Sequence, residues 1–69
     1  MQLARLKEWR EAQGLMQKEL AAMAGTHERT VFRAEHGDSV NPVTTRRLAK
    51  ALGVDVVDLL ENPPVPAQK

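Results

Sequence analysis

The side chains of this 69-residue chain that could perform acid–base or metal chemistry are two histidines, His27 and His36, and nine carboxylates; cysteine is absent. The lack of cysteine excludes disulfides, thiolate metal sites and cysteine nucleophiles. Because the histidines have no cysteine to complete a ligand set, we interpret them as surface residues and expect no metal and no cofactor. No paired carboxylates, nucleophile–base set or phosphate-binding glycine loop is recognisable. A chain this short also has little depth for a substrate pocket, so we expect no enzyme activity.

The distribution of charge points to a different kind of chemistry. The net charge is only +1, but residues 26–50 carry five basic against three acidic side chains, whereas residues 51–62 carry three acidic side chains and no basic one. This asymmetry suits a nucleic-acid face on one side and another role on the other. No apolar run approaches the roughly 20 residues of a membrane span, and no signal-peptide pattern opens the chain, so we expect a cytoplasmic protein associated with the nucleoid.

The elements that must position these side chains are predicted to be helices, because apolar residues recur at helical spacing and alternating strand patterns are absent. The spacing predicts five short helices at about 2–13, 17–24, 28–35, 44–52 and 56–61. Each of the first four is followed by a glycine, where left-handed helix caps favour one. The prediction is thus an all-α fold in one domain over residues 1–62, with a short disordered proline-containing tail at 63–69. The predicted core comprises Leu3, Leu6, Trp9, Leu15, Leu20, Ala24, Val31, Leu48, Leu52, Leu59 and Leu60.

Segment 17–35 is predicted to form two helices that meet at a sharp turn. Ala21 supplies the small side chain needed at the closest approach of the helices, and Gly25 supplies the positive φ angle of the turn. This spacing is that of a helix-turn-helix, whose second helix projects polar side chains into the major groove of DNA. An ordinary pair of packed helices is the alternative interpretation, but packing alone would not require an exposed face that carries arginines.

Six short motifs follow one another between about Leu3 and Leu60. They are Leu6-Lys-Glu-Trp-Arg-Glu, Gly14-Leu15, Gln17-Lys-Glu-Leu-Ala, Thr30-Val-Phe-Arg-Ala-Glu-His-Gly37, Asn41-Pro42 and Leu48-Ala-Lys-Ala-Leu-Gly-Val54. Together they resemble the Cro/CI-type (Xre) helix-turn-helix domain of phage repressors and small bacterial regulators. The resemblance implies a compact five-helix fold like that of lambda repressor. It also implies a sequence-specific transcriptional regulator, most simply a small repressor that inserts helix 28–35 into the major groove of a promoter operator. Double-stranded DNA is the implied partner, bound by a homodimer.

The resemblance also assigns roles to individual side chains. Those that would contact bases are His27, Glu28, Arg29, Phe32 and Arg33. An arginine can hold guanine O6 and N7 together, a glutamate can accept from cytosine N4, and a phenylalanine can touch a thymine methyl group. Those that would contact phosphates are Gln17, Lys18, Thr26, Asn41, Arg46 and Arg47. The two arginines of this second group are expected on the first turn of the fourth helix.

Other positions match or depart from the family pattern in ways that affect structure. Arg10 and Glu35 match a pair that joins the first helix to the third, which we interpret as a structural ion pair. Met16 stands where the family usually has a serine or threonine helix cap, and Thr26 is the candidate cap of helix 28–35. Asp38 stands where many relatives have a basic residue, which is expected to weaken the contact with phosphates.

The last predicted helix has more apolar surface than one small core needs. We interpret Val56, Val57 and Leu60 as a dimer interface, with a fully buried terminal helix as the alternative. A second function from another class is an antitoxin or adaptor that binds a partner protein through the same fold. Because the tail at 63–69 is too short to wrap around such a partner, this alternative ranks below DNA binding.

Overall fold

The computed structural model describes residues 2–64, and it confirms the predicted all-helical fold over that range. The helices are α1 (Leu6–Ala12), α2 (Gln17–Ala24), α3 (Glu28–Glu35), α4 (Pro42–Leu52) and α5 (Val56–Leu60). One isolated antiparallel β-bridge joins Gln2 to Ser39. Within residues 2–64, no helix is both long enough and apolar enough to cross a membrane. Of the predicted tail, residues 65–69 lie outside the described range.

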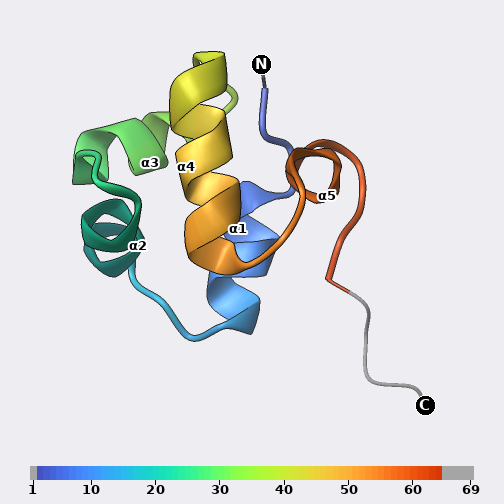
Figure 1. Ribbon diagram of the computed structural model, residues 1–69, viewed down its shortest axis with the longest axis horizontal. Helices are drawn as coiled ribbons and strands as arrows, with labels where there is room; N and C mark the ends of the chain where they lie inside the picture. The colour runs from blue at the N-terminus through green and yellow to red at the C-terminus, as the bar shows by residue number, and fades with distance from the viewer. Residues whose placement is uncertain (1, 65–69) are drawn as a thin grey trace.

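In Figure 1, α4 crosses the middle of the molecule, and it packs against α2 and α5. Both α3 and α4 contact α2, and α1 contacts α3 and α5. In Figure 1, α3 and α5 lie on opposite sides of α4. The core between the helices contains most of the predicted leucines together with small side chains; its buried apolar members are Leu3, Leu6, Leu20, Ala21, Ala24, Val31, Ala34, Val40, Leu48, Ala49, Leu52 and Leu59. Trp9, Leu15 and Leu60, which were predicted to be core residues, are partly buried against this cluster.

The turn between α2 and α3 has the predicted geometry. Gly25 adopts a φ of +71°, which a residue with a side chain rarely adopts, and Ala21 is 3% exposed beneath the turn. The backbone N–H of Thr26 donates to the carbonyl of Ala21 at 2.9 Å and closes the turn. The side chains that fill the wedge between the two helices are Leu20, Ala24 and Val31, and all three are buried.

Two helix starts differ from the prediction. The first helix was expected from about residue 2, but α1 begins at Leu6, because the preceding segment is tied to distant parts of the chain: the N–H of Arg5 donates to the carbonyl of Leu59 at 2.9 Å. The fourth helix was expected from about residue 44, but α4 begins at Pro42. Asn41 caps it by accepting the N–H of Thr44 at 2.8 Å, and the proline occupies the first turn, where its missing N–H costs nothing.

A single tryptophan holds α5 against α1. The indole Nε1 of Trp9 donates to the carbonyl oxygens of Asp58, at 3.1 Å, and Asn62, at 2.7 Å. Leu59 is fully buried on the same helix. Trp9 therefore packs and hydrogen-bonds at once, which fixes the end of α5 on the body of the domain.

Candidate nucleic-acid interface

The two faces of α3 have opposite characters. Val31 and Ala34 face the core with exposures of 0% and 1%. The outer face, together with the residue before the helix, carries the side chains predicted to contact bases; His27, Glu28, Arg29, Phe32 and Arg33 are all exposed. Because the helical repeat separates these groups, the polar face can meet a ligand without disturbing the core.

The aromatic part of this face is ordered by an intrahelical contact. The side chain of Phe32 is 48% exposed, and its ring stacks on that of His36 with centroids 4.0 Å apart. His36 is the C-cap of α3, and its Nδ1 lies 2.8 Å from the carbonyl oxygen of Phe32. His27 is the N-cap of the same helix, so the two histidines lie about 13 Å apart along the helix axis and cannot share a metal ion.

Arg33 has a neighbour of opposite charge on the loop after α3. Its Nε lies 3.8 Å from Oδ2 of Asp38, and the two side chains are 60% and 62% exposed. Sequence reasoning identified Asp38 as a residue that would weaken phosphate contact, but it did not predict this ion pair.

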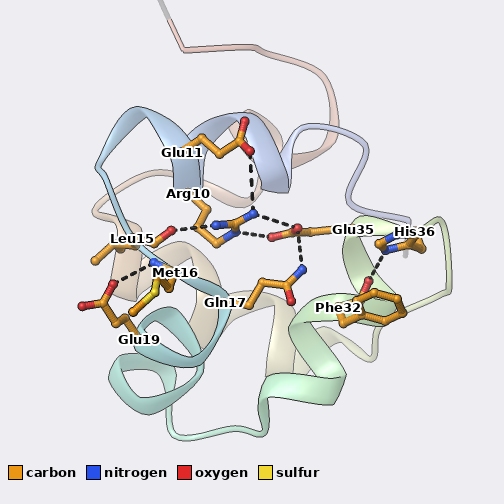
Figure 2. A network of polar contacts seen from close by, with 9 residues as sticks. All are labelled: Arg10, Glu11, Leu15, Met16, Gln17, Glu19, Phe32, Glu35 and His36. Atoms are coloured by element: carbon orange, nitrogen blue, oxygen red, sulfur yellow. Dashed lines mark hydrogen bonds and ion pairs between the residues drawn. The ribbon is translucent and has the colours of Figure 1, made fainter.

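Beneath the exposed face, one buried carboxylate connects three helices, as Figure 2 shows. Glu35 of α3 is 1% exposed at its side chain and accepts from Arg10 of α1, at 2.5 Å from Nε and 3.1 Å from Nη2. Gln17 of α2 donates to the same carboxylate at 3.0 Å. Arg10 also donates to the carbonyl of Leu15 at 2.7 Å, which fixes the connection between α1 and α2. The predicted partners Arg10 and Glu35 are thus in bidentate contact.

The charge of Arg10 is stabilised by this arrangement. The hydrogen bond to Glu35 raises the pKa of the Arg10 guanidinium above its ordinary value; burial opposes the shift, and the charges of Glu35 and Glu11 add to it. A raised pKa means that this stabilisation is fully present below the alkaline pKa of a free arginine and is lost only as the pH rises through the still higher folded value. Arg10 therefore stays charged throughout the ordinary working range of pH.

Gln17 is oriented by this network rather than free in solvent. It is half-buried at the start of α2, and one N–H of its amide is used by Glu35. An amide group has a second N–H and an oxygen for other partners. No sequence signal indicated this contact, because it depends on how α2 and α3 meet.

The starts of α2 and α3 are capped differently. At α2, the N–H of Met16 donates to the carboxylate of Glu19 at 2.8 Å as part of a capping box, which places an acidic side chain in the first turn. At α3, the prediction that Thr26 is the cap is wrong: the N-cap position is His27, whose side chain makes no capping bond. Such helix starts leave backbone N–H groups that favour an anion. Lys18, in the first turn of α2, is exposed.

The structure changes the expected setting of the phosphate candidates on α4. Asn41 uses its side chain to cap the helix. Arg46 and Arg47 are exposed, but they lie in the second turn rather than the first, because α4 starts earlier than predicted. The guanidinium of Arg47 lies beside the turn of the helix-turn-helix: a methyl group added at Gly25 would be 4.0 Å from its Nη1.

The predicted dimer residues on α5 are only partly available. Val57 is 53% exposed, whereas Val56 and Leu60 are half-buried and pack against the core. The helix therefore contributes to the domain's own core and leaves Val57 as its main exposed apolar side chain.

An all-helical domain whose helix-turn-helix presents an exposed, arginine-bearing second helix is a DNA-binding domain of the helix-turn-helix class. The model of the helix-turn-helix family matches residues 6–59, and the chain belongs to this Cro/CI-type (Xre) family of DNA-binding transcriptional regulators. Among solved structures, it is similar to the restriction-modification controller protein C.AhdI from Aeromonas hydrophila, with 38% identity and a TM-score of 0.76. The match covers 80% of this chain and 85% of that one, and it confirms the predicted five-helix fold. A comparison with curated proteins found no match.

Proposed function

We propose that this protein is a small repressor that binds a promoter operator as a homodimer and inserts α3 into the major groove. The observation that carries the proposal is the exposed face of α3, which carries Glu28, Arg29 and Arg33. The opposite face of the same helix is buried in the core. Repression would be steric, by occupation of the promoter, on DNA in the cytoplasm. Control would come from the protein's concentration or from a separate partner.

The proposed contacts fall into two groups. Arg29 and Arg33 would each hold a guanine edge, which is worth about 1–3 kcal/mol of discrimination against a wrong base. The start of α2, with Gln17 and Lys18, would hold a phosphate through its remaining backbone N–H groups and these side chains. With a net charge of only +1, the affinity of one protomer is expected to be modest, which favours a dimer.

The test of this proposal is fluorescence anisotropy with the DNA upstream of the protein's own gene, a shuffled duplex of the same composition, and a salt series. We expect tight binding to the first duplex only, with an affinity that falls steeply as salt rises. Weak binding that treats both duplexes alike would reject operator recognition and favour a protein partner instead.

Gln17→Ala is expected to weaken operator binding by about two- to tenfold per protomer without changing the preferred sequence, because a hydrogen bond from an amide to a phosphate is lost. Selection from a random DNA library with both proteins measures the preference, and anisotropy measures the affinity. Gln13→Ala is the matched control: its amide donates to the carbonyl of Leu52, so its loss should affect stability but not DNA binding. A shifted consensus in Gln17→Ala would contradict the phosphate role.

Val57→Asp is expected to weaken dimerisation at least about tenfold, because a charge would be placed in an apolar contact. Val57 is preferred to Val56 as the test site because Val56 packs on the core of its own protomer. Val43→Asp, at a valine of similar exposure on α4, should leave the dimer intact. Sedimentation, with and without operator DNA, gives the mass; an unchanged mass for Val57→Asp would place the interface elsewhere.

The similarity to a restriction-modification controller protein supports a more specific setting. At 38% identity over most of both chains, the regulated promoter would belong to a restriction-modification gene cluster. Searching the source genome with the selected consensus tests this: sites upstream of such genes support it, and sites confined to unrelated promoters reject it.

A further inference from the structure

A polar hollow lies between the end of α3 and the start of α4, beside the proposed DNA face. It has a volume of about 420 Å³, and its lining residues include Thr30, Asn41 and Thr44. Two of the residues that line it are charged, Arg33 and Asp38, and they are the two that form an ion pair with each other. Arg33, which could offer a positive charge to a nucleic acid at this end of α3, thus already pairs with the carboxylate of Asp38.

The loop that carries this carboxylate is held in place on three sides. The N–H of Asp38 donates to the carbonyl of Arg33 at 3.0 Å. The next residue, Ser39, forms the β-bridge with Gln2, and Val40 is buried with an exposure of 6%. The backbone therefore places Asp38 beside Arg33, so that forming the pair costs only the side-chain freedom of the two residues.

We propose that Asp38 is a specificity-determining residue. Its carboxylate pairs with the guanidinium of Arg33 until a correctly placed guanine takes the place of that carboxylate. The inference rests on the proposed function. When Arg33 leaves Asp38 for a DNA phosphate, one exposed ion pair is replaced with another of similar strength, and such pairs are worth little in water. When Arg33 leaves Asp38 for the edge of a guanine inside a groove, it gains a bidentate contact instead. Asp38 thus suppresses the phosphate contact that Arg33 would make on any sequence and leaves the base contact largely intact.

The decisive variant is Asp38→Asn, which keeps the shape of the side chain and removes its charge. For each bound protomer, we expect affinity for non-specific DNA to rise by about two- to fivefold, the gain from one released exposed cation. The salt dependence of non-specific binding should steepen by about 0.9 in log–log slope per bound protomer, because each one neutralises one more phosphate. Operator affinity should change by less, so the ratio of specific to non-specific binding should fall.

Two further variants separate this effect from a general change of charge. Glu61→Gln removes one negative charge from the exposed end of α5, on the other side of α4 in Figure 1, and should leave the ratio unchanged. In Arg33→Ala, the added Asp38→Asn change should no longer raise non-specific affinity, since the cation to be released is gone. Circular dichroism before each titration establishes that every variant is folded.

The probes are a duplex selected by the wild-type protein from a random library and its shuffled version, titrated by anisotropy over a salt series. A reduced ratio in Asp38→Asn that disappears in the Arg33→Ala background supports the inference. An unchanged ratio, or a gain that persists without Arg33, overturns it and leaves the proposed function standing. If the wild-type protein selects no sequence at all, the proposed function itself fails, and this inference fails with it.

Discussion

Arg10→Met is expected to lower the free energy of unfolding by about 3–5 kcal/mol, the usual cost of removing one partner of a buried ion pair. The size of the effect comes from Glu35, whose side chain is 1% exposed and would be left with only Gln17 as a described side-chain partner. The hydrogen bond from Arg10 to the carbonyl of Leu15 would also be lost. A domain of this size has a small margin of stability, so the variant should be largely unfolded at 37 °C. Urea and thermal unfolding, followed by circular dichroism, measure the change.

The matched control is the same substitution at an exposed arginine. Arg5 pairs with Glu8 at 3.0 Å, but the two side chains are 41% and 46% exposed, so Arg5→Met should cost less than about 1 kcal/mol. Arg10→Met combined with Glu35→Leu should recover much of the lost stability, because no unpaired charge remains in the interior. Equal effects at Arg5 and Arg10 would show that the buried network does not stabilise the fold.

Arg29→Ala is expected to have the largest effect on DNA recognition. Loss of a bidentate contact with guanine, worth about 1–3 kcal/mol, lowers operator affinity roughly 5- to 150-fold per half-site and relaxes the preference at one or two base pairs of each half-site. Arg29 is exposed and has no ion-pair partner among residues 2–64, so its removal should leave the fold unchanged. Library selection followed by anisotropy measures both the preference and the affinity.

Arg46→Ala is the control for this experiment, since it removes the same side chain from an exposed position on α4. A phosphate contact there would weaken binding to all sequences alike. If Arg29→Ala also weakened all sequences to the same degree, the assignment of Arg29 to a base contact would be wrong.

The sequence predicted the ends of α2 and α3 well because local signals determine them. Gly25 ends α2, as its left-handed conformation requires. For α3, the spacing of Val31 and Ala34 predicted both the helix and its inner face. The start of α1 could not be predicted in this way. Leu3 fits the helical spacing and is buried, but the hydrogen bond between Arg5 and Leu59 keeps its segment outside the helix. At α4, the helix was predicted from about residue 44, although an asparagine followed by a proline, here Asn41 and Pro42, is common at a helix start.

The exposed face of α3 was predictable for the same local reason, whereas the contacts among its charged side chains were not. The bond from Gln17 to Glu35 and the pair of Arg33 with Asp38 join residues from different elements. Sequence spacing gives the face of a helix on which a side chain lies, but not the partner that it meets. The predicted cap at Thr26 was wrong although the helix begins where it was predicted, because Thr26 lies one residue before the N-cap position, which His27 occupies.

The single tryptophan gives this protein a built-in spectroscopic label. Because the indole N–H of Trp9 donates to two carbonyl oxygens at the end of α5, its fluorescence is sensitive to whether that helix is docked on α1. It is the chain's only tryptophan and there is no tyrosine, so selective excitation observes this one place without interference. Detachment of the last helix can thus be followed in the unmodified protein, and comparison with circular dichroism, which observes all the helices, distinguishes it from melting of the whole domain.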